Sequence, residues 1–193
     1  MPLTPDAQAV FDALAAGGNP TVVELGLDTT RRQLALWNRV GDAPDVAVED
    51  ADADGVPVRV YRPEGADGTL AWFHGGGWTL GSLDEHDAFC RRFALAAEVT
   101  VANVEYRLAP EHPFPAGLDD CCTATRWAAA NLPGPLAVGG DSAGGNLAAA
   151  VALRSRDEGG PPLAFQLLVY PAVDAELSYP SIRENGEGYF LSA

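Results

Sequence analysis

A chain of 193 residues has the length of one globular domain and can bury a sizeable core. Apolar residues make up 47% and charged residues 20%, which argues against intrinsic disorder. The 12 basic residues are all Arg, and against 27 acidic residues they leave a net charge of −15. Because such a charge repels phosphate backbones and anionic membranes, we expect no nucleic-acid partner.

The cysteine pattern and the start of the chain favour a cytoplasmic location. Cys90, Cys121 and Cys122 are odd in number and two are adjacent, so they do not form a disulfide framework. The first residues lack the basic start and apolar run of a signal peptide, and no apolar run is long enough for a membrane span.

Two helical segments are predicted before residue 45. Residues 4–16 are expected to form a short helix that Thr4 or Asp6 can cap, and a second helix is expected to end at Gly41. The apolar positions at helical spacing are Val10, Phe11 and Leu14 in the first, and Leu34, Trp37 and Val40 in the second.

Strands are predicted from residue 46 onward. Alternating Val residues over 46–60 predict a hairpin around the turn at 52–55. From residue 69 strands and helices alternate, with strands at 70–73, 99–104, 136–138 and 164–169 and helices at 83–97, 116–131 and 143–156. Apolar strands separated by helices predict an α/β domain with a mostly parallel sheet.

The strongest chemical signal is the G-x-S-x-G sequence Gly140–Gly144, which lies between a predicted strand and a predicted helix. This is the setting of a nucleophile elbow, where a sharp turn aims a serine hydroxyl, here that of Ser142, away from the sheet. A second signal, His74–Gly77 (HGGG), directly follows the strand ending at Phe73. Its glycines let backbone N–H groups approach a developing oxyanion.

Together these sequences resemble the hormone-sensitive-lipase-like bacterial esterases. The resemblance rests on the segments His74–Trp78, Tyr106–Ala116, Gly140–Ala148, Val169–Pro171 and Gly188–Ser192. It implies an α/β-hydrolase core over residues 46–193, an N-terminal helical cap segment over residues 1–45, and hydrolysis of short-chain carboxylic esters.

The same resemblance implies roles for individual residues. Ser142 is the expected nucleophile, and the oxyanion hole is expected from the Gly75, Gly76 and Gly77 loop together with the N–H of Ala143. Asp141 is expected to order the elbow. No metal or organic cofactor is implied, because the three His residues lack ligand spacing.

The catalytic triad is incomplete in this sequence. In this fold the acid and the His follow the nucleophile, whereas His74, His86 and His112 all precede Ser142. His74 is expected to shape its loop and His112 to form a structural hydrogen bond. His86 is expected to be solvated or to cap a helix, with an approach to the pocket as the alternative. We therefore expect a sheet that is incomplete on its C-terminal side and weak or no turnover by this chain alone.

The sequence is compatible with three functional hypotheses. The first is an esterase-family hydrolase represented by its N-terminal portion, with a small ester as substrate. The second is a homologue without catalysis that binds a small ligand. The third is one half of a split esterase, which needs a complementing C-terminal fragment. The unpaired sheet edge also leaves association between copies of the chain open.

Overall fold

The computed structural model describes residues 4–16, 22–37, 43–176 and 178–186 of the chain. Its strands are β1 (Ala47–Ala53), β2 (Val56–Arg62), β3 (Thr69–Phe73), β4 (Thr100–Val104), β5 (Leu136–Asp141) and β6 (Phe165–Val169). Its helices are α1 (Pro5–Ala16), α2 (Val22–Leu25), α3 (Leu27–Trp37), α4 (Leu83–Ala97), α5 (Ala116–Asn131), α6 (Ala143–Glu158) and α7 (Pro180–Asn185).

These elements divide into two compact units. One is Arg31–Ala172, which contains the whole sheet, and the other combines Met1–Thr30 with Val173–Ala193. In the smaller unit, α1 begins at the predicted cap, where the Ala7 N–H donates to Thr4 Oγ1 over 3.4 Å. The N-terminal helical cap segment over residues 1–45 stays a prediction.

The sheet is mostly parallel, as predicted. Its strand order is β1-β2-β4-β3-β5-β6. The hairpin β1–β2 and the pair β2–β4 are antiparallel, while β3 pairs in parallel with both β4 and β5, and β5 with β6. Phe73 is in register with Gly140, so the carboxyl ends of β3 and β5 lie side by side. The loop after β3 and the turn after β5 therefore begin at the same edge of the sheet.

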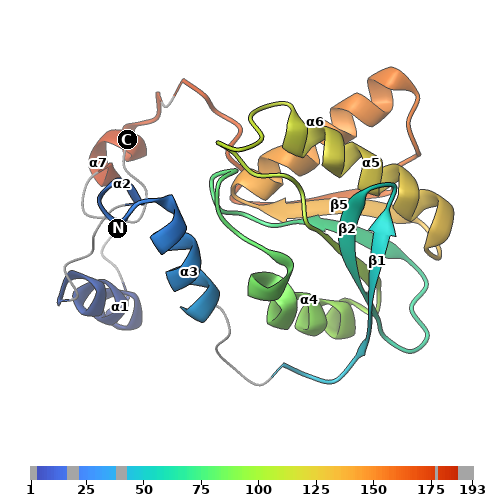
Figure 1. Ribbon diagram of the computed structural model, residues 1–193, viewed down its shortest axis with the longest axis horizontal. Coiled ribbons are helices and arrows are strands. Elements are labelled where there is room, and N and C mark those ends of the chain that lie inside the picture. Colours follow the sequence, from blue (N-terminus) through green and yellow to red (C-terminus); the bar gives the residue numbers. More distant parts are fainter. Residues whose placement is uncertain (1–3, 17–21, 38–42, 177, 187–193) are drawn as a thin grey trace. The chain divides into compact units, whose positions relative to one another are not determined.

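Helices cover both faces of this sheet (Figure 1). Helices α5 and α6 pack on one face, where Phe73 and Val138 are fully buried. Helix α4 packs on the other, against Trp72 and Val101. Alternate residues of each strand point to opposite faces, which explains why the central strands have no polar face.

The structure departs from the sequence prediction mainly at element ends. Strand β5 continues to Asp141 instead of stopping at residue 138, and α6 extends to Glu158. Helices α2 and α7 were not predicted, because they are too short to show a helical repeat. The predicted helix end at Gly41 and the segment Gly188–Ser192 lie outside the described residues.

Candidate active site

Ser142 occupies a strained turn between β5 and α6. Its φ of 53° and ψ of −116° fall in a region that residues with a Cβ rarely adopt. The Ser142 N–H donates to the Val169 carbonyl over 2.9 Å, and the Ser142 carbonyl accepts from the Asn146 N–H at 3.1 Å and the Ala172 N–H at 3.2 Å. These bonds hold the turn between the end of β6 and the first turn of α6.

The glycines around Ser142 allow backbone to pack on backbone. A Cβ on Gly144 would overlap the Phe73 carbonyl, and one on Gly140 would overlap the backbone of Gly144. The sharp turn at Ser142 therefore requires glycine at both position 140 and position 144. Because Ser142 immediately precedes α6, it lies at the positive end of the helix dipole.

The HGGG loop is tied directly to this turn. The Gly75 N–H donates to Asp141 Oδ1 over 2.9 Å, and a Cβ on Gly75 would overlap the Asp141 carboxylate. The expectation that Asp141 orders the elbow is confirmed by this bond. Because the Gly75 N–H is already engaged, the N–H groups of Gly76, Gly77 and Ala143 remain as candidate oxyanion donors.

His74 is the buried support of the same loop. Its Nδ1 lies 2.8 Å from the Gly75 carbonyl, and since a carbonyl only accepts, Nδ1 carries the proton. The Tyr106 hydroxyl donates to the His74 carbonyl over 2.7 Å, and the two rings stack at 4.4 Å. Burial, and secondarily the charge of His86, lower the pKa of His74 to about 3, so the ring is neutral. The expected loop-shaping role of His74 is confirmed.

His86 lies beside the HGGG loop and the elbow. Its ring stacks on His74 with centroids 5.3 Å apart, and its Nε2 is 3.8 Å from Asp141 Oδ1. Only 19% of its side chain is exposed, so the expectation of a solvated residue is wrong. The burial of His86 is hard to predict from the sequence, because the residue falls in the first turn of α4 and is covered by the neighbouring loop.

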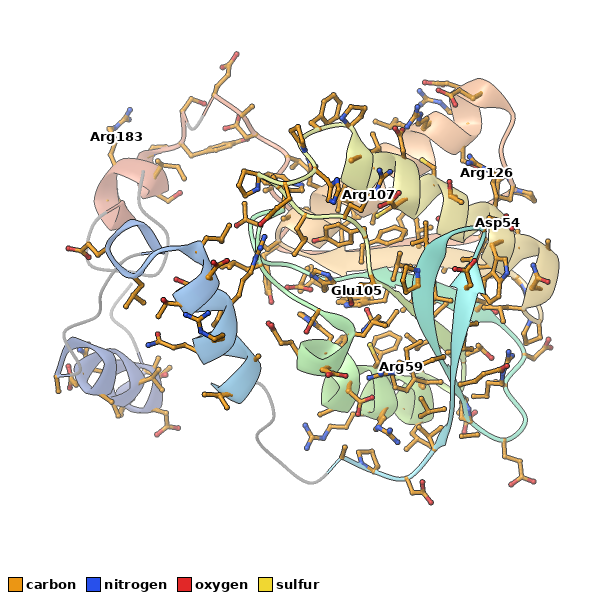
Figure 2. The ribbon with its side chains drawn as sticks, in the orientation of Figure 1. Asp54, Arg59, Glu105, Arg107, Arg126 and Arg183 are labelled. Carbon is orange, nitrogen blue, oxygen red and sulfur yellow. The ribbon has the colours of Figure 1, made fainter. Side chains whose placement is uncertain are left out.

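The segment after β4 packs behind the HGGG loop. Figure 2 labels Glu105 and Arg107, which flank Tyr106. The Glu105 carboxylate accepts the Leu83 N–H at the start of α4 over 2.6 Å, and burial raises its pKa. Arg107 forms a two-bond ion pair with Asp120 of α5. Tyr106 and Arg107, the first two residues of the Tyr106–Ala116 sequence, therefore make structural contacts.

The described contacts of the three histidines are with neighbouring loops and side chains, not with the Ser142 hydroxyl. In the described residues, neither His74, His86 nor His112 forms a hydrogen bond with the Ser142 hydroxyl. The His112 N–H donates to the Leu108 carbonyl, which is a structural bond of the predicted kind, although it involves the backbone. Asp174 caps a local turn, because its Oδ1 accepts the Glu176 N–H over 3.1 Å.

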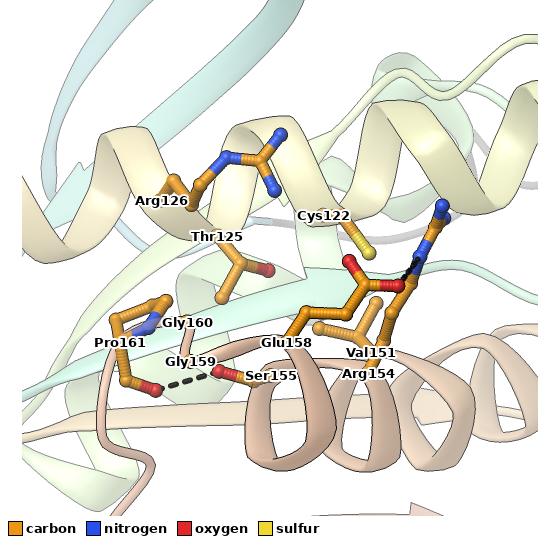
Figure 3. A pocket seen from close by; sticks show the side chains of 10 residues that line it. All are labelled: Cys122, Thr125, Arg126, Val151, Arg154, Ser155, Glu158, Gly159, Gly160 and Pro161. Atoms are coloured by element: carbon orange, nitrogen blue, oxygen red, sulfur yellow. Dashed lines mark hydrogen bonds and ion pairs between the residues drawn. The ribbon is translucent and has the colours of Figure 1, made fainter.

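A separate cavity of about 140 Å³ lies between α5 and α6 (Figure 3). Ten residues line it, and none belongs to the elbow or the HGGG loop. Its polar groups largely satisfy one another: Arg154 pairs with Glu158 over 3.1 Å, and the Ser155 hydroxyl donates to the Pro161 carbonyl over 2.7 Å. This cavity is not the candidate active site.

Two kinds of feature are absent from the described part of the chain. Across these residues no group of three or more His, Cys, Asp or Glu side chains is arranged to hold a metal ion. No helix within the described ranges is long and apolar enough to cross a membrane.

Comparison with known proteins decides the family. A family model described as the alpha/beta hydrolase fold matches residues 70–193. The ethyl acetate hydrolase of Pseudomonas putida is 37% identical over 219 aligned positions, which cover 100% of this chain and 68% of that protein. The chain belongs to the hormone-sensitive-lipase-like α/β-hydrolases.

Other relatives of this α/β-hydrolase chain are also named as esterases. Carboxylesterase NlhH of Mycobacterium tuberculosis is 48% identical over 162 residues, covering 77% of this chain and 51% of the relative. A solved ester hydrolase from the Lake Arreo metagenome superposes with a TM-score of 0.90 at 37% identity, covering 99% of this chain and 67% of that one. The chain spans about half the length of NlhH.

Proposed function

We propose that this α/β-hydrolase chain carries the nucleophile half of a serine carboxylesterase that acts on short-chain esters. Ser142 attacks the ester carbonyl, and the N–H groups of Gly76, Gly77 and Ala143 stabilise the oxyanion. The observation that carries the proposal is the Asp141–Gly75 hydrogen bond of 2.9 Å, which joins the candidate oxyanion loop to the Ser142 turn. The substrate class is drawn from the relatives, which are named as esterases.

We propose in addition that the 193-residue chain by itself turns over slowly. A serine hydroxyl is a poor nucleophile until a base accepts its proton, and no His follows Ser142 in the sequence. Losing triad members in a serine protease costs on the order of 10⁴- to 10⁶-fold in kcat. An acid and a His supplied by a complementing segment would restore the missing proton transfer.

One observation favours such a complementing segment over a ligand-binding role without catalysis. Strand β6 is at the edge of the described sheet, and Phe165 is 64% exposed. A further strand or a second copy of the chain could pair with this edge. The proposal includes a helical cap from residues 1–45. It also includes a cytoplasmic location, which agrees with three buried free thiols.

Hydrolysis of p-nitrophenyl acetate tests the proposal when it is measured with and without added imidazole. Imidazole supplies an external base, so we expect a slow basal rate that rises on imidazole addition in the wild-type chain. The matched control is Ser142→Ala, which reports hydrolysis by imidazole alone and by the oxyanion loop.

The outcomes separate the two claims. Equal rates for wild type and Ser142→Ala in imidazole would show that Ser142 is not the nucleophile. Rapid, Ser142-dependent turnover without imidazole would support Ser142 as the nucleophile. It would contradict the proposal that the chain by itself lacks a base for Ser142.

A further inference from the structure

One arginine outside the recognised motifs bridges the two loops behind the candidate oxyanion hole. Arg31 lies in α3, within the unit that contains the sheet. Its Nε donates to the Thr79 carbonyl over 2.9 Å, and its Nη2 donates to the Ala109 carbonyl over 3.1 Å. A single guanidinium therefore ties together two chain segments that are about thirty residues apart in sequence.

The Thr79 end of this bridge belongs to the turn that holds Gly76. The Gly76 carbonyl accepts the N–H groups of Thr79 at 3.1 Å and Leu80 at 2.9 Å. The Ala109 N–H in turn donates to the Trp78 carbonyl over 2.9 Å. Arg31 thus closes a ring of hydrogen bonds around the peptide groups next to the proposed donors.

Glu111 holds the guanidinium in the orientation that this bridge needs. Its two carboxylate oxygens accept from Arg31 Nη1 at 2.8 Å and Nη2 at 3.0 Å. The Arg31 hydrogen bonds lower the pKa of Glu111 to about 2, so the pair is ionised at neutral pH. Since Glu111 is half exposed, the ion pair itself contributes little stability, and its main effect is to fix the direction of the fork.

We propose that Arg31 is a positioning residue for the oxyanion loop, which keeps the N–H groups of Gly76 and Gly77 aimed at the position of the oxyanion. The inference rests on the proposed function for its catalytic meaning. Oxyanion donors act because they are fixed before the reaction, so a loop that opens even transiently loses part of their effect. Lysine cannot replace Arg31 fully, because an ammonium lacks the planar fork that reaches both carbonyls and Glu111.

Hydrogen exchange tests this role without requiring catalysis. We expect Arg31→Met to accelerate exchange of the Thr79 and Leu80 amides about tenfold or more, which is the effect of losing one or two charge-assisted hydrogen bonds. In Arg31→Lys the exchange rates of these two amides should lie between those of the wild type and of Arg31→Met. Amides of β3, which lies in the same sheet, should change by less than about twofold.

The matched control is Arg156→Met, which removes the same charge from an exposed residue that pairs with its neighbour Asp157. It should leave exchange at Thr79 and Leu80 unchanged. Unchanged exchange at both amides in Arg31→Met would overturn the proposal. Equal acceleration in β3 would also overturn it, because the effect would then be global destabilisation.

A catalytic readout separates this proposal from the proposed function. In the imidazole-supplemented assay, Arg31→Met should lower the Ser142-dependent kcat with little change in KM, and Arg31→Lys should restore part of it. If no Ser142-dependent rate exists, the proposed function fails while the exchange result still decides whether Arg31 positions the loop. A change in KM alone would contradict a role in aiming the oxyanion donors.

Discussion

His74 shows how a single neutral side chain supports the candidate oxyanion loop. The ring is fully buried between Tyr106 and His86, and its Nδ1–H donates to the Gly75 carbonyl. Protonation would place a charge in a site without solvent and beside a second imidazole. The native state therefore requires the neutral ring, and the pKa of about 3 expresses that requirement.

Acid should destabilise the fold through this residue. The ordinary pKa of His is 6.5 and the folded value is about 3, so the unfolded chain binds the proton first as pH falls. The free energy of unfolding therefore keeps the full contribution of neutral His74 above pH 6.5. Between pH 6.5 and 3 it falls by up to about 1.4 kcal/mol for each pH unit.

The measurement is an NMR titration of the His74 ring, which should keep its neutral Nδ1–H form down to pH 5. The exposed His112 is the internal reference for the same spectra. A His74 midpoint above pH 5 would contradict the buried neutral imidazole and its role in holding Gly75.

At the scale of elements, the junction of β5 with α6 decides the geometry of Ser142. The junction packs against the carboxyl end of β3, and Gly144 leaves no space for a side chain beside the Phe73 carbonyl. The strained Ser142 backbone is maintained because both flanking elements are fixed by the sheet and by α6.

Gly144→Ala should therefore destabilise the protein by about 2 kcal/mol or more, because its Cβ forces β3 and α6 apart. Gly68→Ala is the matched control, since its Cβ would lie 3.6 Å from Val99 Cγ1, an ordinary contact. Its effect on the free energy of unfolding should stay within about 0.5 kcal/mol. Urea unfolding of both variants provides the comparison, and equal stabilities would contradict the close approach at Gly144.

Much of this element structure could be predicted from the sequence. The alternation of apolar strands with amphipathic helices is local information, and it placed β3, α4, β4 and α5 within about one residue of their observed ends. The elbow and the HGGG loop were found because their glycines are needed for backbone approach. The sequence did not show that Arg31 and His86 lie beside this loop, because their contacts join segments that are remote along the chain.

The end of β5 could likewise not be predicted from the local sequence pattern. Apolar periodicity stops at Val138, yet the strand continues through Gly139 and Gly140 to Asp141 because β3 and β6 pair with it on both sides. The register that places the HGGG loop beside Ser142 is set by this pairing. Tertiary pairing, which the local pattern does not contain, extended the strand.

At the scale of the whole molecule, an apolar sheet edge is combined with a high negative charge. Phe165 of β6 and Tyr170, which directly follows the strand, are 64% and 73% exposed, and the net charge is −15. The edge favours association, whereas the charge opposes it through repulsion between copies. The balance should depend on ionic strength, since salt screens the repulsion and leaves the apolar contact.

We expect the isolated chain to associate more strongly when salt is raised from about 0.02 M to about 0.5 M, and Phe165→Lys to reduce this association. Sedimentation velocity at several protein concentrations measures both effects. Leu153→Lys, at an exposed apolar residue of α6, controls for the added charge. A monodisperse monomer under both salt conditions would contradict an interactive β6 edge.

We propose that the strained turn presents Ser142 as a nucleophile beside its oxyanion donors. The most direct test of this proposal is peptide mass mapping after the chain reacts with a p-nitrophenyl phosphonate in the presence of imidazole, which accepts the serine proton. We expect one phosphonyl adduct on the peptide that contains Ser142, and none on that peptide in Ser142→Ala. No adduct in the wild-type chain, or an adduct on another serine such as Ser155 or Ser82, would contradict it.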